Sequence, residues 1–374
     1  MAPITLQEIL KDLPIDWKTS EPVGNVAVHA IRFDSRAVVA GDLFVAVSGG
    51  SADGHDYISS AVKNGAIAVV GTREIANPGV PYIRVADSRE ALAYLAAVYY
   101  LHPARKLMVI GVTGTDGKTT TSNLLFEILQ EAGIRAGLIS TVNAVIGDEV
   151  IDTGFHVTTP EAPDVQRYLS RMVDAGLTCV VLESTSHGLA QHRVTACEYD
   201  IAVVTNITHE HLDYHGSYEE YRAAKARMFL ELGKTALKPG GNPRLAVLNR
   251  DDQSYDFLSN LVHDNQVSYG IRGKGDLTAH SIFSDPSGVD FIISDGTNEV
   301  NAHCNLPGRF NVSNCLAAIG AARGAGIDLQ TAARGIGRLQ RVPGRMETID
   351  LGQAFTAIVD FAHTPNALKV AIET

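Results

Sequence analysis

The sequence contains few cysteines, no long apolar run and no surplus of positive charge. The four cysteines are widely spaced and form no C-x-x-C pair, which argues against a disulfide framework and a zinc knuckle. No stretch approaches the ~20 apolar residues that a membrane-spanning helix needs. The first residues lack the basic and apolar regions of a signal peptide. We therefore expect a cytoplasmic protein that does not bind membranes.

The charge balance also restricts the possible partners. The chain has 31 Lys and Arg residues against 42 Asp and Glu residues, a formal net charge of −11. A general nucleic-acid binder would show a basic surplus, so we expect no nucleic-acid partner. An anionic ligand would have to be met by a local positive site. The length of 374 residues allows two or three domains.

One stretch has the features of a phosphate-binding loop. Residues 107–112 predict a short buried strand, and residues 118–133 predict an amphipathic helix, with T-G-T-D-G-K-T-T at 113–120 joining them. The glycines let backbone N–H groups point at an anion, and the helix N-terminus adds its positive dipole end. Lys118 would reach the outer phosphates, and Thr119 would offer a hydroxyl to Mg²⁺. The strict Walker pattern is not met, because Val112 stands where its first glycine belongs.

The order of the predicted elements indicates an α/β fold in three parts. Residues 1–104 predict a separate α/β domain. In residues 105–343 strands and helices alternate, as a mostly parallel sheet with helices on both faces requires. Residues 344–374 follow these two parts. A predicted strand ends at Glu183, where a carboxylate beside the phosphate loop is well placed for Mg²⁺.

The histidine-rich stretch 209–215, H-E-H-L-D-Y-H, has three interpretations. It nearly matches the zinc pattern H-x-H-x-D-H of metallo-β-lactamase-like hydrolases, but Tyr214 separates the last two ligands. It could be a polar loop with capping residues. It could also supply a single histidine to a metal ion near the phosphates.

Lys225 is unexpected where it stands. Residues 218–232 predict a helix, and Lys225 falls four residues from both Tyr221 and Phe229 on the apolar face. A lysine can extend from such a face to solvent. Alternatively, burial lowers the pKa of a lysine, and the neutral amine can react with CO₂ to give an anionic carbamate that binds metal.

Several motifs occur together in a fixed order and resemble those of one family. They are D-S-R-x(4)-G-D-L-F-V-A at 34–46, A-D-G-H at 52–55, the phosphate loop, T-T-P-E at 158–161, E-S-T-S-H-G-L-A-Q-H-R at 183–193, H-L-D-Y-H-G at 211–216, A-K-A-R-M-F at 224–229, G-R-F-N-V-S-N at 308–314 and G-R-M-E at 344–347. The chain resembles the Mur ligases, ATP-dependent amide-bond-forming enzymes of peptidoglycan precursor synthesis. Among them it is most similar to those that add the third amino acid of the peptide.

The resemblance implies a role for each matching position. The family acts on a UDP-linked substrate, and the implied contacts to its uridine end are Ser35, Gly50, Ser51 and Ala52. Those to its pyrophosphate and muramoyl-peptide part are Thr158, Thr159, Thr185, Gln191 and Arg193. Those to ATP are Gly114, Thr115, Asp116, Gly117, Lys118, Thr119, Thr120, Asn314, Arg345, Asp360 and His363. Two Mg²⁺ ions would be surrounded by Thr119, Glu183, His211 and a carbamate on Lys225. The implied catalytic residues are Lys118, Lys225 and His211.

Three positions depart from the family pattern. Asp116 replaces a common Asn, Phe361 replaces a common Tyr, and His209 stands where Arg is frequent. Asp116 adds a negative charge near phosphate that the resemblance does not explain.

The implied reaction joins UDP-N-acetylmuramoyl-L-alanyl-D-glutamate to a free amino acid through an acyl phosphate. The resemblance also implies that residues 344–374 are a hinge and the start of a C-terminal domain that is largely absent. Because that domain selects the amino acid in this family, we expect an incomplete enzyme. For the same reason the sequence does not specify which amino acid is added. We also expect a monomer. Two other classes remain open: a P-loop switch or motor ATPase, and a zinc hydrolase of the H-x-H type.

Overall fold

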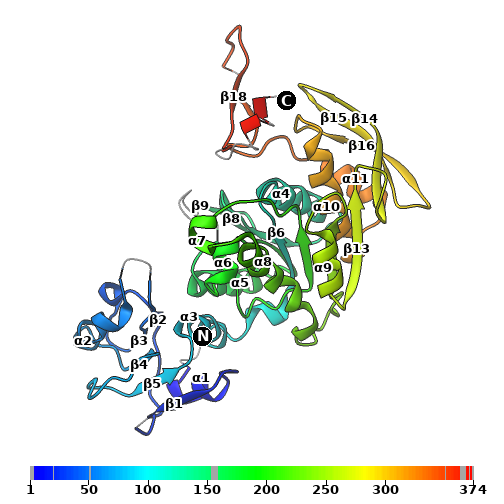
Figure 1. Cartoon of the computed structure of the whole chain (residues 1–374). Helices are drawn as coiled ribbons and strands as arrows, with labels where there is room; N and C mark the ends of the chain where they lie inside the picture. The colour runs from blue at the N-terminus through cyan, green and yellow to red at the C-terminus, as the bar shows by residue number, and fades with distance from the viewer. Residues whose placement is uncertain are drawn as a thin grey trace. The chain divides into compact units, whose positions relative to one another are not determined.

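The computed structural model describes residues 4–19, 21–49, 52–152, 159–349, 351–362, 368–369 and 371–372. It separates into two compact units, each with its own sheet (Figure 1). The first unit contains Met1–Ala104, Pro160–Ser170 and Gln191–Cys197. The second contains Arg105–Thr159, Arg171–Ala190 and Glu198–Thr374. The α/β class predicted from the sequence is confirmed.

The first unit is built on a five-stranded sheet of order β1-β5-β4-β3-β2. Its strands are β1 (Trp17–Thr19), β2 (Ile31–Arg32), β3 (Leu43–Val45), β4 (Ala68–Gly71) and β5 (Tyr82–Val85). Strands β2 to β5 are parallel, and β1 is an antiparallel edge. Every residue of β3 and β4 is buried, as expected for central strands that are covered on both faces.

The helices of the first unit are α1 (Leu6–Lys11), α2 (Ile58–Lys63) and α3 (Ser88–Tyr99), and side-chain caps precede α1 and α3 but not α2. At α1, Thr5 and Glu8 form a reciprocal capping box. At α3, the carboxylate of Asp87 accepts hydrogen bonds from the N–H groups of Arg89 and Glu90. These caps satisfy N–H groups that have no partner within the helix.

An eleven-stranded sheet forms the second unit, with the order β16-β15-β14-β13-β12-β11-β6-β10-β7-β8-β9. Its strands are β6 (Met108–Thr113), β7 (Ala136–Ile139), β8 (Asn143–Ile146), β9 (Glu149–Asp152), β10 (Cys179–Glu183), β11 (Ile201–Val204), β12 (Leu245–Asn249), β13 (Asn265–Gly270), β14 (Leu277–Asp285), β15 (Gly288–Ser294) and β16 (Glu299–Cys304). The neighbours from β7 across to β14 pair in parallel. The outer strands pair antiparallel, β8 and β9 at one end and β15 and β16 at the other.

The remaining helices are α4 (Lys118–Glu131), α5 (Ala162–Asp174), α6 (Ser186–Ala190), α7 (Leu212–His215), α8 (Tyr218–Leu230), α9 (Tyr255–Leu261), α10 (Phe310–Gly324) and α11 (Leu329–Ile336). Helix α4 packs against both α10 and α11. Its buried face includes Leu124, Leu125, Ile128 and Leu129, which join the main core cluster with strands β6, β10 and β11. Among the helices of the described residues, none is long and apolar enough to cross a bilayer.

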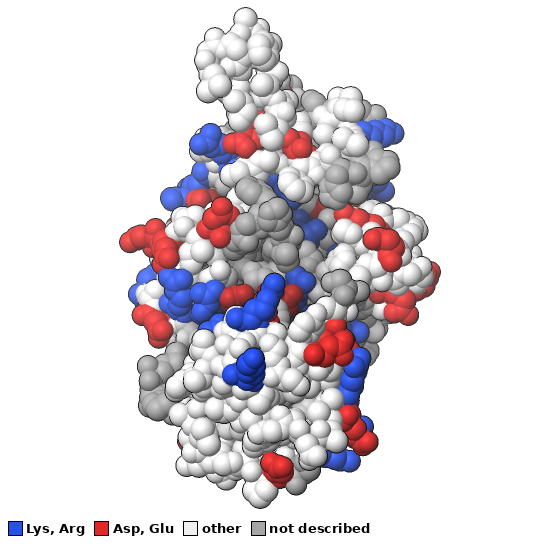
Figure 2. Space-filling view, turned by 90° about the vertical axis from the view of Figure 1, so that its left-hand side faces the viewer, with Lys and Arg blue, Asp and Glu red and all other residues white. Residues whose placement is uncertain are grey.

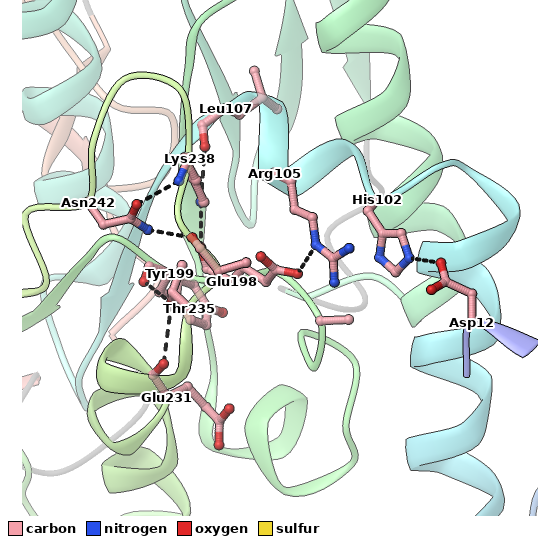
Figure 3. Close-up of polar contacts among 12 residues, drawn as sticks. Asp12, His102, Arg105, Leu107, Glu198, Tyr199, Glu231, Thr235, Lys238 and Asn242 are labelled. Carbon is pink, nitrogen blue, oxygen red and sulfur yellow. Dashed lines mark hydrogen bonds and ion pairs between the residues drawn. The ribbon is translucent and has the colours of Figure 1, made fainter. Parts of the chain in front are cut away.

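A buried ion pair between Lys238 and Asp200 fixes the N-terminal ends of the central strands. Figure 3 shows Lys238 in contact with Leu107 and Asn242. The Lys238 ammonium donates to Asp200 Oδ2 at 2.6 Å and to the carbonyl oxygens of Leu107, at 3.0 Å, and Glu198, at 2.6 Å. Asp200 Oδ2 also accepts from the N–H of Val109 at 2.7 Å. Because each charge has several partners, burial of both is tolerated at this end of β6 and β11.

A two-stranded hairpin, β17 (Glu347–Ile349) and β18 (Ala357–Val359), follows the last helices. The N–H of Phe361 donates to the carbonyl of Gly344 at 2.9 Å, which closes the base of the hairpin. The helix start predicted near position 364 lies outside the described residues.

Candidate nucleotide-binding site

The predicted loop joins the end of β6 to the start of α4, and its backbone needs glycine at two positions. Gly114 has φ +151° and Gly117 has φ +80°. A β-carbon at Gly114 would lie 1.8 Å from Thr205 Oγ1, and one at Gly117 would lie 2.3 Å from Asn314 Oδ1. Both close approaches therefore require a residue without a side chain.

The segment after β11 holds the loop through its backbone. The N–H of Thr115 donates to the carbonyl of Asn206 at 2.8 Å, and the N–H of Asp116 donates to Asn206 Oδ1 at 3.0 Å. Thr205 Oγ1 donates to the carbonyl of Asp116 at 2.6 Å. Asn206 was not singled out from the sequence. A polar residue directly after a parallel strand nevertheless indicates a side chain at the carboxyl edge of the sheet, where ligands bind.

Lys118, the first residue of α4, lies at the mouth of the loop. Its ammonium donates to the carbonyl oxygens of Gly114, at 3.0 Å, and Thr115, at 2.7 Å. Figure 2 shows basic and acidic side chains interspersed over one face of the molecule rather than separated by sign. Within the loop, residues 113–120, Lys118 is the one cationic side chain.

Glu183 ends β10, beside β6 in the parallel sheet, and is completely buried. Its Oε1 accepts from Thr119 Oγ1 at 3.0 Å and from Thr141 Oγ1 at 3.0 Å, and its Oε2 accepts from the N–H of Thr141 at 3.0 Å. Arg345 donates to Thr119 Oγ1 at 3.3 Å. A carboxylate and two hydroxyl oxygens thus converge, which are ligands that Mg²⁺ prefers. Thr141 was not singled out from the sequence.

Lys225 on α8 does not extend to solvent, so that interpretation was wrong. The residue is 1% exposed, and its Nζ donates to the carbonyl of Gly114 at 2.7 Å. The Nζ also lies 4.6 Å from the ring centroid of Tyr221. Burial, together with the nearby charge of Lys118, lowers the pKa of Lys225 well below its usual range. The side chain therefore favours the neutral amine.

The histidine-rich stretch does not form a zinc site. The ring of His211 lies 4.7 Å from that of His187 on α6, and His209 stacks on Tyr218. Within the described part of the chain, no three His, Cys, Asp or Glu side chains are placed to hold a metal ion. The zinc-hydrolase alternative therefore has no support from the geometry.

A cavity of ≈ 550 Å³ brings many of the predicted residues together. The predicted residues that line it are Thr115, Asp116, Gly117, Lys118, Thr119, Thr120, Glu183, Thr185, His211, Asn314, Arg345 and Asp360. Asn314 donates to Asn311 Oδ1 at 2.9 Å, and Asp360 accepts from the N–H groups of Met346 and Ala362. Other lining residues, among them Asp251, Arg272 and Phe310, were not singled out from the sequence. His363 lies outside the described residues.

The residues expected at the muramoyl-peptide part fall into two pairs. In the second unit, Thr159 Oγ1 lies 3.1 Å from Thr185 Oγ1 and accepts from the N–H of Thr185. In the first unit, Arg193 donates to Gln191 Oε1 at 2.8 Å and forms an ion pair with Glu161 at 3.0 Å. Thr158 lies outside the described residues.

Near the expected uridine contacts, Ser35 is buried in a short 3₁₀ turn, and its carbonyl accepts from Asn64 Nδ2 at 2.9 Å. The carbonyl of Ala52 accepts from the N–H of Gly49 at 2.8 Å. Gly50 and Ser51 lie outside the described residues.

The fold and site define a class of protein. A glycine loop between a parallel strand and a helix, with a lysine at its mouth and a carboxylate at the end of the next strand, is typical of enzymes that bind nucleotide phosphates.

Comparisons with known proteins give the family. The family model for the Mur ligase middle domain matches residues 112–322, and that for the Mur ligase family, catalytic domain, matches residues 27–100. UDP-N-acetylmuramoyl-L-alanyl-D-glutamate–2,6-diaminopimelate ligase of Geobacillus thermodenitrificans is 42% identical over 369 residues, covering 99% of this chain and 74% of that protein. A UDP-N-acetylmuramyl-tripeptide synthetase of Roseiflexus sp. is 41% identical, covering 97% of this chain and 73% of that protein.

A solved structure of a UDP-N-acetylmuramoyl-L-alanyl-D-glutamate–2,6-diaminopimelate ligase matches with a TM-score of 0.81 and 30% identity, covering 100% of this chain and 74% of that one. MurF ligase of Thermotoga maritima in complex with ADP shares the fold, with a TM-score of 0.65 and 23% identity over 92% of this chain and 74% of that one. The chain belongs to the Mur ligase family. It is an ATP-dependent amide ligase of peptidoglycan precursor synthesis.

Proposed function

We propose that this chain supplies the ATP and UDP-substrate sites of an enzyme that joins the terminal carboxylate of UDP-N-acetylmuramoyl-L-alanyl-D-glutamate to the amine of a free amino acid, with the reaction centred on the phosphate loop. The observation that carries this assignment is the contact between Glu183 and Thr119, because it sets a carboxylate beside the first turn of the loop's helix. Seven relatives named for this substrate are 35–42% identical over 93% or more of this chain.

The reaction has two steps that place different demands on the site. In the first, the γ-phosphoryl group of ATP passes to the substrate carboxylate, giving an acyl phosphate and ADP. In the second, the amine attacks the acyl carbon, loses a proton and expels inorganic phosphate, leaving the amide. Negative charge on oxygen grows in both steps. Lys118 and the N–H groups of the loop would stabilise that charge, since they are fixed in place before the reaction.

The residues around Glu183 fit one of the two expected Mg²⁺ ions. Thr119, Thr141 and Glu183 direct oxygens toward one another over 3.0–3.4 Å. Such an ion would neutralise phosphate charge and orient the transferred group. Thr119 and Glu183 are the residues that would hold it.

The second ion would lie with His211 and Lys225, and it fits only if Lys225 carries a carbamate. An ammonium group there would repel Mg²⁺, whereas a carbamate supplies an anionic oxygen ligand. The burial of Lys225 and its lowered pKa both favour the neutral amine that reacts with CO₂. In that reaction the amine nitrogen bonds to the carbon of CO₂, and the product loses a proton.

We further propose that residues 1–104 bind the uridine end of the substrate, that residues 105–343 carry out the ligation, and that residues 344–374 complete the ATP site and lead into a third domain. Ser35, Gly50, Ser51 and Ala52 would contact uridine. The pyrophosphate and muramoyl-peptide part would be held by Thr158, Thr159, Thr185, Gln191 and Arg193. In the ATP site, Asn314 would approach adenine, with Arg345, Asp360 and His363 completing it. ATP and a UDP-linked substrate are cytoplasmic metabolites, so the protein would act there, as a monomer.

The relatives' names make 2,6-diaminopimelate the first amino acid to test, and we propose L-lysine as the second. Both carry a free amine that can attack the acyl phosphate.

Calorimetric binding separates the three functional classes. The ligase assignment predicts that the chain binds both ATP and UDP-N-acetylmuramoyl-L-alanyl-D-glutamate, and that Lys118→Ala weakens only the first. A switch or motor ATPase would bind nucleotide but not the UDP-linked substrate. A zinc hydrolase would bind stoichiometric zinc and no ATP. Failure to bind the UDP-linked substrate would contradict the proposal.

A further inference from the structure

The hydroxyl of Thr115 is a junction between the phosphate loop and its neighbours. Thr115 Oγ1 accepts from the N–H of Thr208 at 2.9 Å and lies 2.9 Å from the hydroxyl of Tyr221. Thr115 is 5% exposed and Tyr221 is completely buried. A buried hydroxyl that has several partners fixes its own backbone, because losing the partners would leave polar atoms unpaired.

Tyr221 extends the junction to a third element. Its hydroxyl donates to Glu210 Oε2 at 3.3 Å, and the Thr115 hydroxyl also lies within donating distance of the Thr208 carbonyl oxygen, at 3.4 Å. These contacts join Thr208, Thr115, Tyr221 and Glu210 in one hydrogen-bond network.

The same tyrosine also contacts Lys225. The Lys225 Nζ lies 4.6 Å from the Tyr221 ring centroid and binds the carbonyl of Gly114, the residue before Thr115. Tyr221 therefore uses its ring toward Lys225 and its hydroxyl toward the loop, so substitution by phenylalanine separates the two contacts.

We propose that Tyr221 is a positioning residue of the nucleotide site, whose hydroxyl holds the phosphate loop against α8 and the segment 206–211 through Thr115. This inference rests on the proposed role of the loop in binding ATP. A loop that is already ordered presents its N–H groups to phosphate without a further loss of conformational freedom on binding. Without the hydroxyl, the loop keeps its contacts to Thr205 and Asn206 but loses this one, so nucleotide binding must supply part of the order.

The test measures ADP affinity by calorimetry in matched variants. Tyr221→Phe keeps the ring and should weaken ADP binding about three- to tenfold, the equivalent of one hydrogen bond. Tyr199→Phe is the control, because its hydroxyl is also buried and lies 2.8 Å from Ser184 Oγ, which does not line the cavity. It should leave ADP affinity unchanged. Urea denaturation of each variant measures the free energy of unfolding separately.

A double-mutant cycle tests whether Tyr221 acts through Thr115. Thr115→Val should weaken ADP binding, and adding Tyr221→Phe to it should cause little further loss, because the connection is already broken. Thr115→Ser keeps the hydroxyl and should retain the affinity. This conservative rescue keeps the test informative even if Tyr221→Phe destabilises the fold.

The outcomes separate this inference from the assignment of the loop. If Lys118→Ala weakens ADP binding while Tyr221→Phe binds like the wild type, the positioning role of Tyr221 is wrong and the loop assignment stands. Additive losses for Thr115→Val and Tyr221→Phe would also overturn the role. If Lys118→Ala binds ADP like the wild type, the loop assignment itself fails.

Discussion

The Nζ of Lys225 lies 2.7 Å from the carbonyl oxygen of Gly114, although 111 residues separate the two in sequence. A lysine from the apolar face of α8 thus ends against the backbone of the phosphate loop. This contact links the two least usual features of the sequence, a glycine loop and a lysine on a buried helix face. Both belong to one site.

Lys118→Ala should weaken nucleotide binding while leaving the fold intact. The substitution removes a charge-assisted contact to phosphate, worth about 1.5–3 kcal/mol. Among the described residues, Lys118 donates to the carbonyls of Gly114 and Thr115 in its own loop, so its loss strands no buried charge there. Calorimetric titration with ATP measures the first effect, and urea denaturation measures the second. Unchanged ATP affinity would contradict the assignment of the loop.

Lys238→Met should destabilise the protein strongly without touching the site. It leaves the buried carboxylate of Asp200 unpaired, and breaking a buried pair in this way costs about 3–5 kcal/mol. Adding Asp200→Asn should recover part of the loss, because the amide can still accept from the N–H of Val109 without carrying a charge. Denaturation of the two variants gives both values. A loss that the second substitution does not reduce would argue against an ionic origin.

Asp53 should make the free energy of unfolding depend on pH in the acid range. Burial alone would raise its pKa, but hydrogen bonds from the backbone N–H and ring of His55 and from Ser48 outweigh burial and lower the pKa from 3.8 to about 2. Because the folded value is the lower one, the stabilisation is fully present above about pH 4 and is lost as pH falls toward about 2. The difference in unfolding free energy between wild type and Asp53→Asn should shrink over this range. A constant difference would contradict the shift.

Lys225→Arg and Lys225→Ala should both abolish most ligase activity in the enzyme. A guanidinium stays protonated and does not take up CO₂, so it places a positive charge where an anionic ligand is expected. Short carboxylic acids should restore part of the activity of Lys225→Ala by supplying the missing oxygen ligand. Turnover of ATP that depends on both the UDP-linked substrate and the amino acid is the measurement. Full activity in Lys225→Arg would exclude the carbamate.

Local patterns in the sequence predicted the parts of the site that depend on neighbouring residues. The strand before the loop, the helix after it and the position of Glu183 at a strand end all follow from hydrophobic periodicity. Thr141 and Asn206 could not be found in this way, because their contacts depend on how separate loops meet at the edge of the sheet.

The fold, like the site, has parts that local sequence patterns predicted and parts that depend on tertiary contacts. The alternation of strands and helices predicted the parallel part of the sheet. It did not predict that β14, β15 and β16 follow one another without helices, because their pairing depends on contacts between strands. The helical period placed Lys225 on a buried face, but only the tertiary structure shows that this face lies against Gly114.

The most direct measurement of the carbamate, the central chemical claim, is carbon-13 NMR of the protein in labelled bicarbonate at mildly alkaline pH. We predict a carbamate carbonyl resonance in the wild type that disappears in Lys225→Arg and on acidification, which protonates the carbamate and releases CO₂. Tyr199→Phe should keep the resonance. A wild-type spectrum without it, or one that persists unchanged in Lys225→Arg, would contradict the account.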